Sequence, residues 1–309
     1  ADMAVALSLV SGIVLSYATE GRQKRFIRSA FNQYVGEEVL DEMTRDPSKL
    51  RLGGEKKEIT MFFSDLEKFS SFSERLDPPR LIELLNVYLT EMGEVIKQET
   101  GGYLDKFVGD AIVAFWNGPV AQPDHAARAV RAAILCQRRL AEKRDEWASQ
   151  YNAVLKMRIG IGTGEVVVGN MGSRDKFNYT MLGDAANASS RLEGSNKAFG
   201  TYTMVSDVTW AQAQGAALGR ELAAIRVVGR KTPVKVYEPM GLAGETLPAW
   251  VPKFEQGVAL CREQKWKEAR AIFEGIPDDP PSKVYAQRCR DLASGVLKEW
   301  DGVWNLTEK

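Results

Sequence analysis

Histidine and cysteine are scarce in this sequence. The 309 residues include a single histidine, His125, and three cysteines, Cys136, Cys261 and Cys289. One histidine leaves almost no material for a His-based zinc site or a Ser-His-Asp triad. The cysteines are far apart in the sequence and lack CxxC spacing, which argues against a disulfide framework and favours a reducing compartment. We expect His125 to be a surface residue at the start of a helix.

An excess of charge of either sign is also missing. Lys and Arg number 41, and so do Asp and Glu, which gives a formal net charge of zero. Binding of duplex nucleic acid through bulk charge needs many unpaired Lys and Arg residues, so we expect no nucleic-acid partner. A hydrophobic content of 44% is enough to build a core, and the length suits roughly two domains.

Long apolar runs are absent except near the start of the sequence. Residues 3–18 carry no charge and precede a cluster of basic residues between positions 22 and 28. A full membrane span needs about 20 apolar residues, so residues 1–21 are interpreted as a truncated transmembrane helix with the basic cluster on the cytoplasmic side. A buried helix of a soluble protein is the alternative. Residues 22–55 have helical, amphipathic spacing and are expected to form a transducing helix or a linker.

Strand and helix patterns alternate after residue 56. A buried strand at 59–63, a helix at 81–96, two strands at 103–108 and 111–116 and a helix at 125–140 precede strand patterns at 154–161 and 165–168. This order predicts an α+β fold with a ferredoxin-like βαββαβ core on an antiparallel sheet. The glycines at 160, 162 and 164 indicate either a tight hairpin or a close backbone approach. A dinucleotide-binding fingerprint is rejected because a strand follows them, where that motif requires a helix.

The composition changes again near residue 242. We therefore assign residues 56–241 to a catalytic domain and residues 242–309 to a helical tail. Gly257, Leu260, Ala269, Phe273 and Pro281 have the spacing of one tetratricopeptide-type hairpin. Because a single unit of this kind rarely folds alone, the tail is expected to pack on the catalytic domain or on a partner.

Two aspartates are the first candidates for chemistry. Asp65 follows the strand pattern at 59–63, and Asp110 lies in the turn between the next two strands, 45 residues later. Neighbouring strands of a ferredoxin-like sheet would bring the two carboxylates together, which suits a hard cation such as magnesium and hence phosphate chemistry. Aspartates are also common in turns for conformational reasons. The following segment, with Phe69 and Ser70, opens a helix whose free N–H groups suit a triphosphate, although a serine there is also an ordinary N-cap.

Three ordered motifs then point to a family. They are residues 63–70 (FSDLEKFS), 106–110 (KFVGD) and 182–192 (LGDAANASSRL). In order and spacing they resemble the catalytic domain of class III nucleotidyl cyclases over about residues 56–240, and the segment before them resembles the membrane exit of membrane-bound bacterial members.

The resemblance implies roles for individual residues. Asp65, Asp110 and the carbonyl of Leu66 would hold two Mg²⁺ or Mn²⁺ ions per site. Lys106 and Thr180 would contact the purine, a combination typical of adenylyl cyclases, because lysine can only donate to adenine N1 while threonine can accept from the exocyclic amine.

The resemblance also implies residues for the transition state. Asn187 would orient the ribose and Arg191 would stabilise the charge developing on the α-phosphate. Their separation of four residues places them on one face of a helix. In the phosphate-contact segment, Val228 stands where many members have lysine, so Arg230 is expected to contact the phosphates instead, with Arg226 and Lys231 as alternatives.

The implied activity is conversion of ATP to 3′,5′-cyclic AMP and pyrophosphate by a head-to-tail homodimer, in a membrane-anchored protein with a cytoplasmic catalytic domain. Each site would combine Asp65 and Asp110 of one chain with Lys106, Thr180, Asn187 and Arg191 of the other. Guanylyl cyclase activity is one alternative. Two others are a non-catalytic dimeric nucleotide-binding module and a protein-interaction scaffold centred on the tail.

Overall fold

The computed structural model describes residues 51–213, 215–226 and 232–306. It divides into two units. The smaller unit contains residues 51–53 and 169–179 of the described chain, and the larger contains residues 54–168 and 180–306. In the smaller unit, the turn between two strands is closed by a 2.8 Å hydrogen bond from the N–H of Ser173 to the carbonyl of Lys176. The residues that carry the candidate site lie in the larger unit.

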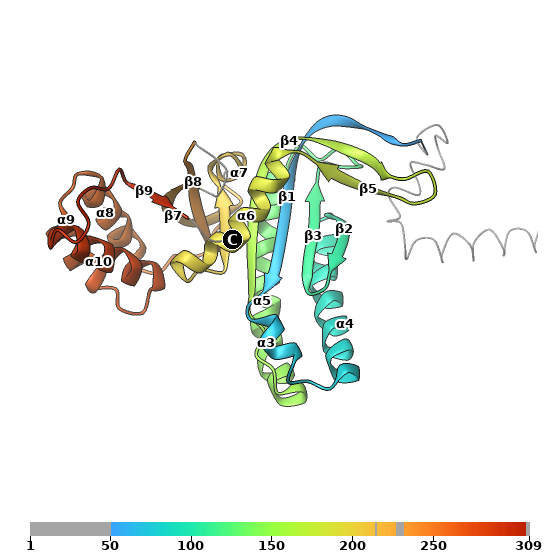
Figure 1. Ribbon diagram of the computed structural model, residues 1–309, viewed down its shortest axis with the longest axis horizontal. Coiled ribbons are helices and arrows are strands. Elements are labelled where there is room, and N and C mark those ends of the chain that lie inside the picture. Colours follow the sequence, from blue (N-terminus) through green and yellow to red (C-terminus); the bar gives the residue numbers. More distant parts are fainter. Residues whose placement is uncertain (1–50, 214, 227–231, 307–309) are drawn as a thin grey trace, which may run out of the picture. The chain divides into compact units, whose positions relative to one another are not determined.

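The sheet begins with four strands in ferredoxin-like order. They are β1 (Gly53–Leu66), β2 (Tyr103–Val108), β3 (Ala111–Trp116) and β4 (Met157–Gly172). Their spatial order is β2-β3-β1-β4, and β1 and β2 both pair with β3 in antiparallel fashion (Figure 1). This is the order that the alternation of strand and helix patterns predicts, so the mixed α+β interpretation is confirmed.

The sheet continues beyond β4 through shorter strands. In space β6, β8, β7 and β9 follow in that order, and β5 also pairs with β4. The pairings of β6 with β4 and of β9 with β7 are parallel, whereas β8 is antiparallel to both of its neighbours. The bounds of these strands are β5 (Phe177–Leu182), β6 (Thr203–Ser206), β7 (Ala217–Arg226), β8 (Val234–Leu242) and β9 (Val303–Asn305).

Helices cover the sheet and form most of the tail. They are α3 (Phe69–Ser73), α4 (Pro78–Glu94), the π-helical turn η2 (Val95–Glu99), α5 (His125–Tyr151), α6 (Asp184–Phe199), α7 (Asp207–Gln212), α8 (Val251–Arg262), α9 (Trp266–Glu274) and α10 (Pro280–Ala293). Alternate strand residues such as Phe62, Ala114 and Ile159 are fully buried in one core with apolar residues of α4 and α5. Because side chains alternate along a strand, α4 and α5 cover one face of the sheet.

The two strand patterns around Gly162 form one strand, so the predicted hairpin there is wrong. β4 runs without a break from Met157 to Gly172. The glycines serve the other expected purpose, which is a close backbone approach. A Cβ atom at Gly160 would lie 2.2 Å from the backbone N of Glu193, and one at Gly162 would lie 2.1 Å from the Oγ of Ser189. Helix α6 therefore lies directly on the backbone of β4.

His125 begins α5 as expected, but it is buried, so the prediction of a surface residue is wrong. Its side chain is 7% exposed, and Nδ1 lies 2.7 Å from Oγ1 of Thr60 on β1. The same hydroxyl lies 2.7 Å from Oγ1 of Thr163, which in turn is 2.9 Å from Oγ1 of Thr209. His125 thus ends a chain of hydroxyl groups that links α5, β1, β4 and α7.

This environment gives an expected pH dependence of stability. Burial lowers the pKa of His125 below its ordinary value, so the unfolded chain takes up a proton more readily than the folded one. The stability that comes from neutral His125 is present above the unfolded pKa and is lost as the pH falls from there through the lower folded pKa. We expect urea unfolding at pH 7.5 and 5.5 to show a smaller loss of stability on acidification in His125→Asn than in the unchanged protein. An equal loss in both proteins would contradict this assignment.

The tail packs on the far end of the sheet and shares a core with it. Leu222 and Ile225 of β7 are buried with Phe254 of α8 and Tyr285 of α10, and the hydroxyl of Tyr285 donates to the carbonyl of Leu222 at 2.9 Å. Figure 1 shows α8, α9 and α10 gathered beside β7 and β9. The helical tail therefore packs on the same body that carries the sheet. Its likeness to a tetratricopeptide hairpin stays a prediction.

A buried arginine also joins the tail to the sheet. Arg220 of β7 is 2% exposed, and its guanidinium donates two hydrogen bonds of 2.8 and 2.7 Å to Asp279, which precedes α10. It also bonds Glu238 of β8 at 2.8 Å and lies 4.1 Å from the ring centre of Phe254. A buried charge of this kind is tolerated because it is paired and hydrogen-bonded.

The fold brings together two cysteines that are distant in sequence. The sulfur atoms of Cys261 on α8 and Cys289 on α10 lie 3.4 Å apart, and both are free thiols, as is Cys136. Separation along the chain was therefore a poor guide to their separation in space.

Three sequence predictions concern other parts of the chain. The helix predicted over residues 1–21, the transducing helix or linker predicted over 22–55 up to residue 50, and the phosphate-contact residues Val228 and Arg230 lie outside the described residues. Residues 53–55 of the predicted helix or linker belong to β1 instead. Across residues 51–306, wherever the chain is described, no helix has the length and apolar character that crossing a membrane requires.

Candidate active site

Two acidic side chains meet where β1 ends. Asp65 is the penultimate residue of β1, and Asp110 lies in the turn between β2 and β3, where Gly109 adopts a positive φ of 64°. The backbone N–H of Leu66 donates to Oδ2 of Asp110 at 3.0 Å. Burial, together with the neighbouring Asp65 carboxylate, raises the pKa of Asp110 to about 6. We call Asp65 and Asp110 the carboxylate pair.

The carboxylate pair has the donor chemistry that a hard cation requires. Like charges held together at a half-buried site favour a bound cation or a proton. Mg²⁺ is commonly held by one or two carboxylates plus substrate phosphates, so a larger protein cage is unnecessary. Accordingly, the described residues contain no group of three or more Asp, Glu, His or Cys side chains arranged for a metal. Asp65, Asp110 and the Leu66 carbonyl are the residues that fit such an ion.

A buried arginine beside the carboxylate pair was not found from the sequence. Arg158 of β4 is 7% exposed and donates to Glu193 of α6 at 3.1 Å. Its guanidinium also lies 4.0 Å from the Asp65 carboxylate and 3.8 Å from that of Glu67. Arg158 therefore supplies positive charge behind Asp65 and ties the end of β1 to α6. The only signal for it was an arginine within residues 157–161, which are otherwise apolar residues and glycine.

The residues predicted to receive a triphosphate lie at the start of α3. Phe69 packs against the main core, whereas Ser70 is exposed. The carbonyl of Ser70 accepts a 2.9 Å hydrogen bond from the hydroxyl of Ser73. With only five residues, α3 is too short for a substantial helix dipole, so its role toward phosphate rests on the family resemblance.

Lys106 and Thr180, which we call the Lys–Thr pair, are brought into contact by the fold. Lys106 is on β2 and Thr180 on β5, and the ammonium nitrogen lies 3.2 Å from Oγ1 of the threonine. Asp105 joins them, since its Oδ2 accepts the Thr180 hydroxyl at 2.7 Å and lies 3.4 Å from Nζ of Lys106. Sequence reasoning missed Asp105. The side chains of Lys106 and Asp105 are 42% and 1% exposed, so of these two charged groups only the lysine is open to a ligand.

Asn187 and Arg191 lie one turn apart on α6. Asn187 is exposed and Arg191 is half-buried. Their helix begins at Asp184, directly after the strand that carries Thr180. The close approach of α6 to the glycines of β4 fixes the height at which both side chains stand above the sheet.

This packing gives a testable expectation. Gly160→Ala would place a Cβ atom within 2.2 to 2.8 Å of the backbone of α6 at Ser189, Leu192 and Glu193. Backbone cannot give way as a flexible side chain does, so we expect a loss of about 1–3 kcal/mol in unfolding free energy. Thermal unfolding would measure it. The matched control is Gly93→Ala on α4, whose Cβ would meet Leu104 at an ordinary 3.4 Å. Equal stability of the two variants would contradict the close-approach interpretation.

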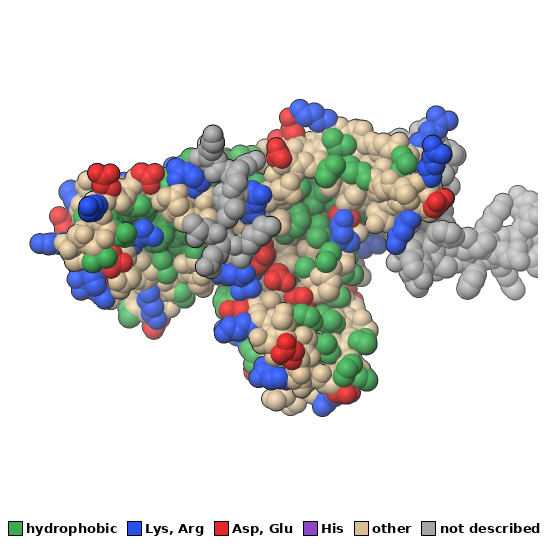
Figure 2. Space-filling view, viewed as in Figure 1, with side chains coloured by type: hydrophobic (Ala, Val, Ile, Leu, Met, Phe, Trp, Pro, Cys, Tyr) green, Lys and Arg blue, Asp and Glu red, His purple; other side chains and the backbone are tan. Residues whose placement is uncertain are grey.

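The predicted site residues thus form three groups in one chain: the carboxylate pair, the Lys–Thr pair with Asp105, and the two residues on α6. Within the described part of the chain, no hydrogen bond or ion pair links the carboxylate pair to the Lys–Thr pair. Arg230 lies outside that part. On the face drawn in Figure 2, basic and acidic side chains are interspersed.

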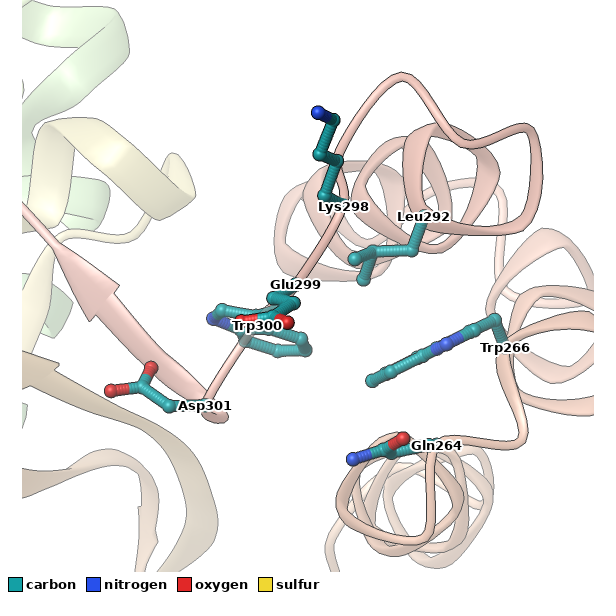
Figure 3. Close-up of a pocket in the computed structure, with 7 residues that line it drawn as sticks. All are labelled: Gln264, Trp266, Leu292, Lys298, Glu299, Trp300 and Asp301. Carbon is teal, nitrogen blue, oxygen red and sulfur yellow. The ribbon is translucent and has the colours of Figure 1, made fainter.

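A pocket of about 340 Å³ lies elsewhere, in the tail. Figure 3 shows the indole of Trp266 extending toward Trp300, with Leu292 above them and the side chains of Lys298 and Asp301 at the margin. The two indole centres are 5.9 Å apart, so the rings already contact each other. None of the predicted site residues lines this pocket, so it is not a part of the candidate active site.

The fold and these three groups agree with the resemblance to class III nucleotidyl cyclases, and comparison with known proteins identifies the family. The sequence profile of the adenylate and guanylate cyclase catalytic domain matches residues 53–236, which is 184 of the 309 residues. The chain therefore belongs to the adenylate and guanylate cyclase catalytic domain family.

Individual relatives agree with this assignment. Adenylate cyclase 1 of Rhizobium meliloti (strain 1021) is 34% identical over 187 residues, covering 60% of this chain and 28% of that protein. The adenylate cyclase of Anabaena cylindrica is 30% identical over 188 residues, covering 60% of this chain and 35% of that protein. The chain thus spans about a third of the length of these curated relatives.

Solved structures that resemble this chain include both adenylyl and guanylyl cyclases. The adenylyl cyclase CyaB from P. aeruginosa is 32% identical with a TM-score of 0.59, covering 63% of this chain and all of that one. The guanylyl cyclase Cya2 is 33% identical with a TM-score of 0.57, covering 62% of this chain and 96% of that one. Overall similarity therefore does not separate the two substrates, and the site residues must do so.

Proposed function

We propose that this chain is the catalytic part of an adenylyl cyclase, which converts ATP to 3′,5′-cyclic AMP and pyrophosphate. In this reaction the 3′-oxygen of ATP forms a bond to the α-phosphorus. The bond between the α-phosphorus and the oxygen that bridges the α- and β-phosphates breaks at the same time. The 3′-hydroxyl proton is released, and the pyrophosphate leaves. The single observation that carries the choice of ATP is the contact between Lys106 and Thr180.

The Lys–Thr pair matches the edge of adenine. Adenine presents an acceptor at N1 and a donor at its 6-amino group. The Lys106 ammonium can only donate, which suits N1, whereas the Thr180 oxygen can accept from the amino group. Guanine presents the reverse arrangement, with a donor at N1 and a carbonyl at position 6. On donor and acceptor grounds the pair therefore favours ATP.

The carboxylate pair would hold two divalent ions, Mg²⁺ or Mn²⁺, with the Leu66 carbonyl. Such ions lower the pKa of a 3′-hydroxyl and neutralise phosphate charge. Asn187 would orient the ribose and Arg191 would donate to the α-phosphate as negative charge grows there. Phe69, Ser70 and Arg230 would contact the phosphates. Buried His125 is not needed as a base in this scheme.

A homodimer would complete the site, because among the described residues of one chain no hydrogen bond or ion pair joins the carboxylate pair to the Lys–Thr pair. Apolar side chains next to the Lys–Thr pair are exposed and suit a second copy. Phe107 and Val108 at the end of β2 are 46% and 59% exposed, and Leu182 at the end of β5 is 67% exposed. Large exposed apolar side chains grouped near a site are typical of interaction surfaces.

The direct test is to incubate the purified protein with Mg-ATP or Mn-ATP, and in parallel with GTP, at several protein concentrations. We expect cyclic AMP as the main product and a specific activity that rises with protein concentration. Absence of product with both metals, in protein shown to be dimeric, would refute the proposal. A preference for GTP would instead support the guanylyl cyclase alternative, and nucleotide binding without turnover would support a non-catalytic module.

Complementation tests the dimer geometry. Mixing Asp65→Ala and Asn187→Ala chains leaves one intact composite site in each mixed dimer, so an equimolar mixture should recover about a quarter of the activity. Mixing Asp65→Ala with Asp110→Ala is the control, because both lesions lie in the same half of the site and no intact site can form. Activity in the control mixture would contradict the head-to-tail arrangement. The absence of activity from both mixtures would also contradict it.

The segments outside the catalytic domain have proposed roles as well. Residues 1–21 would anchor the protein in a membrane with the catalytic domain in the cytoplasm, and residues 22–55 would couple a signal to it. The TPR-like tail over residues 242–309 would act with the catalytic domain 56–241. Cell fractionation with a protease-protection assay would test the anchor and its orientation.

A further inference from the structure

A β-bulge in β2 brings two consecutive side chains to the same hydroxyl group. In a regular strand, successive side chains point to opposite faces. The register of β2 against β3 shifts between Leu104 and Lys106, which makes Asp105 the extra residue. Lys106 Nζ and Asp105 Oδ2 then lie 3.2 and 2.7 Å from Oγ1 of Thr180. Bulges re-aim side chains in this way, and this one turns Asp105 toward the Lys–Thr pair.

Asp105 is a costly residue to bury. Its side chain is 1% exposed, and its second oxygen, Oδ1, has no hydrogen-bond partner among the described residues. Burial raises the pKa of this carboxyl, while the contacts with Thr180 and Lys106 act in the opposite direction. A buried carboxylate with one unsatisfied oxygen destabilises a fold. Its presence beside the Lys–Thr pair therefore points to a role in the site.

We propose that Asp105 is a positioning residue that fixes the direction of the Thr180 hydroxyl and thereby makes the Lys–Thr pair select adenine over guanine. A threonine hydroxyl has one proton and two lone pairs. An ionised carboxylate can only accept, so Asp105 takes the hydroxyl proton. The Lys106 ammonium donates to one lone pair. The remaining lone pair faces the ligand, and Thr180 can only accept there.

The consequence for the purine follows from its 6-position. The 6-amino group of adenine donates to the remaining lone pair of Thr180. Guanine carries an oxygen at this position, which would meet another acceptor, because the hydroxyl proton is already held by Asp105. A site built to pair with one group rejects an analogue that leaves its buried polar atoms unpaired. Without Asp105, the hydroxyl could rotate and donate to guanine.

Substitution of Asp105 tests this inference, which rests on the proposed function. Asp105→Asn keeps the shape but offers an amide that can donate to Thr180 and release the hydroxyl proton. We expect the ratio of kcat/KM for ATP to that for GTP to fall about tenfold. Asp145→Asn, an exposed carboxylate on α5, is the matched control and should leave the ratio unchanged. Asp105→Ala removes the carboxylate altogether and should also lower the ratio. It provides the test if the asparagine variant folds poorly.

A double-mutant cycle separates positioning from a general structural effect. Thr180→Val removes the hydroxyl, so Asp105→Asn should change the nucleotide ratio less than about twofold in that background. Thr180→Ser keeps the hydroxyl and should retain the preference for ATP. The inference is overturned if Asp105→Asn folds and leaves the ratio unaltered, or if its effect is the same with and without the Thr180 hydroxyl.

Binding without turnover distinguishes failure of this inference from failure of the proposed function. Calorimetry with 3′-deoxy-ATP and 3′-deoxy-GTP, which cannot cyclise, should show tighter adenine binding that Asp105→Asn weakens relative to guanine. Such a result supports the inference even if the protein makes no cyclic AMP, an outcome that would refute only the proposed activity. Equal affinity of the unchanged protein for both analogues would overturn the inference.

Discussion

Asp110→Asn is expected to lower cyclic AMP formation about a thousandfold while leaving the protein folded. The asparagine keeps an oxygen that can accept the Leu66 N–H, so the turn between β2 and β3 retains its hydrogen bond. It removes the negative charge that would hold a divalent ion, and several kcal/mol of transition-state stabilisation depend on such an ion. Measuring kcat with Mg-ATP and Mn-ATP tests this expectation.

The same variant, Asp110→Asn, should be at least as stable as the unchanged protein. Burial beside Asp65 raises the pKa of Asp110 to about 6, so at pH 7.5 the folded metal-free protein holds a charge that is less favourable than in the unfolded chain. Asp110→Asn removes that cost and should match or exceed the unchanged protein in melting temperature without metal. Activity within tenfold of the unchanged protein would contradict a metal role for Asp110. Asp145→Asn serves as the control for removal of an exposed carboxylate.

Asp279→Ala should cost about 3–5 kcal/mol of unfolding free energy, because it leaves the buried Arg220 guanidinium without its bidentate partner. Asp279 also caps α10, since its Oδ2 accepts from the backbone N–H of Ser282 at 3.0 Å and from its hydroxyl at 2.6 Å. The substitution therefore weakens the tail and its attachment together. Chemical denaturation of the full chain would measure the loss.

The neighbouring residue provides the control for that substitution. Asp278 is exposed, so Asp278→Ala should change stability by no more than about 0.5 kcal/mol. Arg220→Met combined with Asp279→Ala should be less harmful than Asp279→Ala alone, because the unpaired buried charge is then absent. A loss below 1 kcal/mol in Asp279→Ala would contradict the inference that this ion pair stabilises the attachment of the tail.

The order of strands and helices could be predicted from local patterns because each pattern depends on residues close in sequence. The short apolar run before Asp65 and the turn at Gly109 were sufficient for β1 and for the hairpin of β2 and β3. The hairpin predicted at Gly162 was wrong because a glycine that allows a turn and one that admits a neighbouring helix give the same local signal. The partner that decides between them, Ser189, lies 27 residues away.

The site could be predicted only in part for a similar reason. The contact between Lys106 and Thr180 joins residues 74 positions apart, and the family motifs were needed to pair them. Asp105 was missed because strand alternation places it opposite Lys106, and only the pairing with β3 reveals the bulge. The burial of His125 was missed because its hydrogen-bond partner, Thr60, precedes it by 65 residues, and local sequence patterns do not show such a contact.

The seating of α6 on β4 has a mechanical consequence. Because Gly160 and Gly162 place the helix against the strand backbone, no layer of side chains can deform between them. Asn187 and Arg191 must therefore travel with β4, and β4 lies beside β1, the strand that carries Asp65. In the proposed homodimer, each chain would be one stiff half of the catalytic apparatus. Control of turnover would then come from the angle and distance between two such halves rather than from bending within either one.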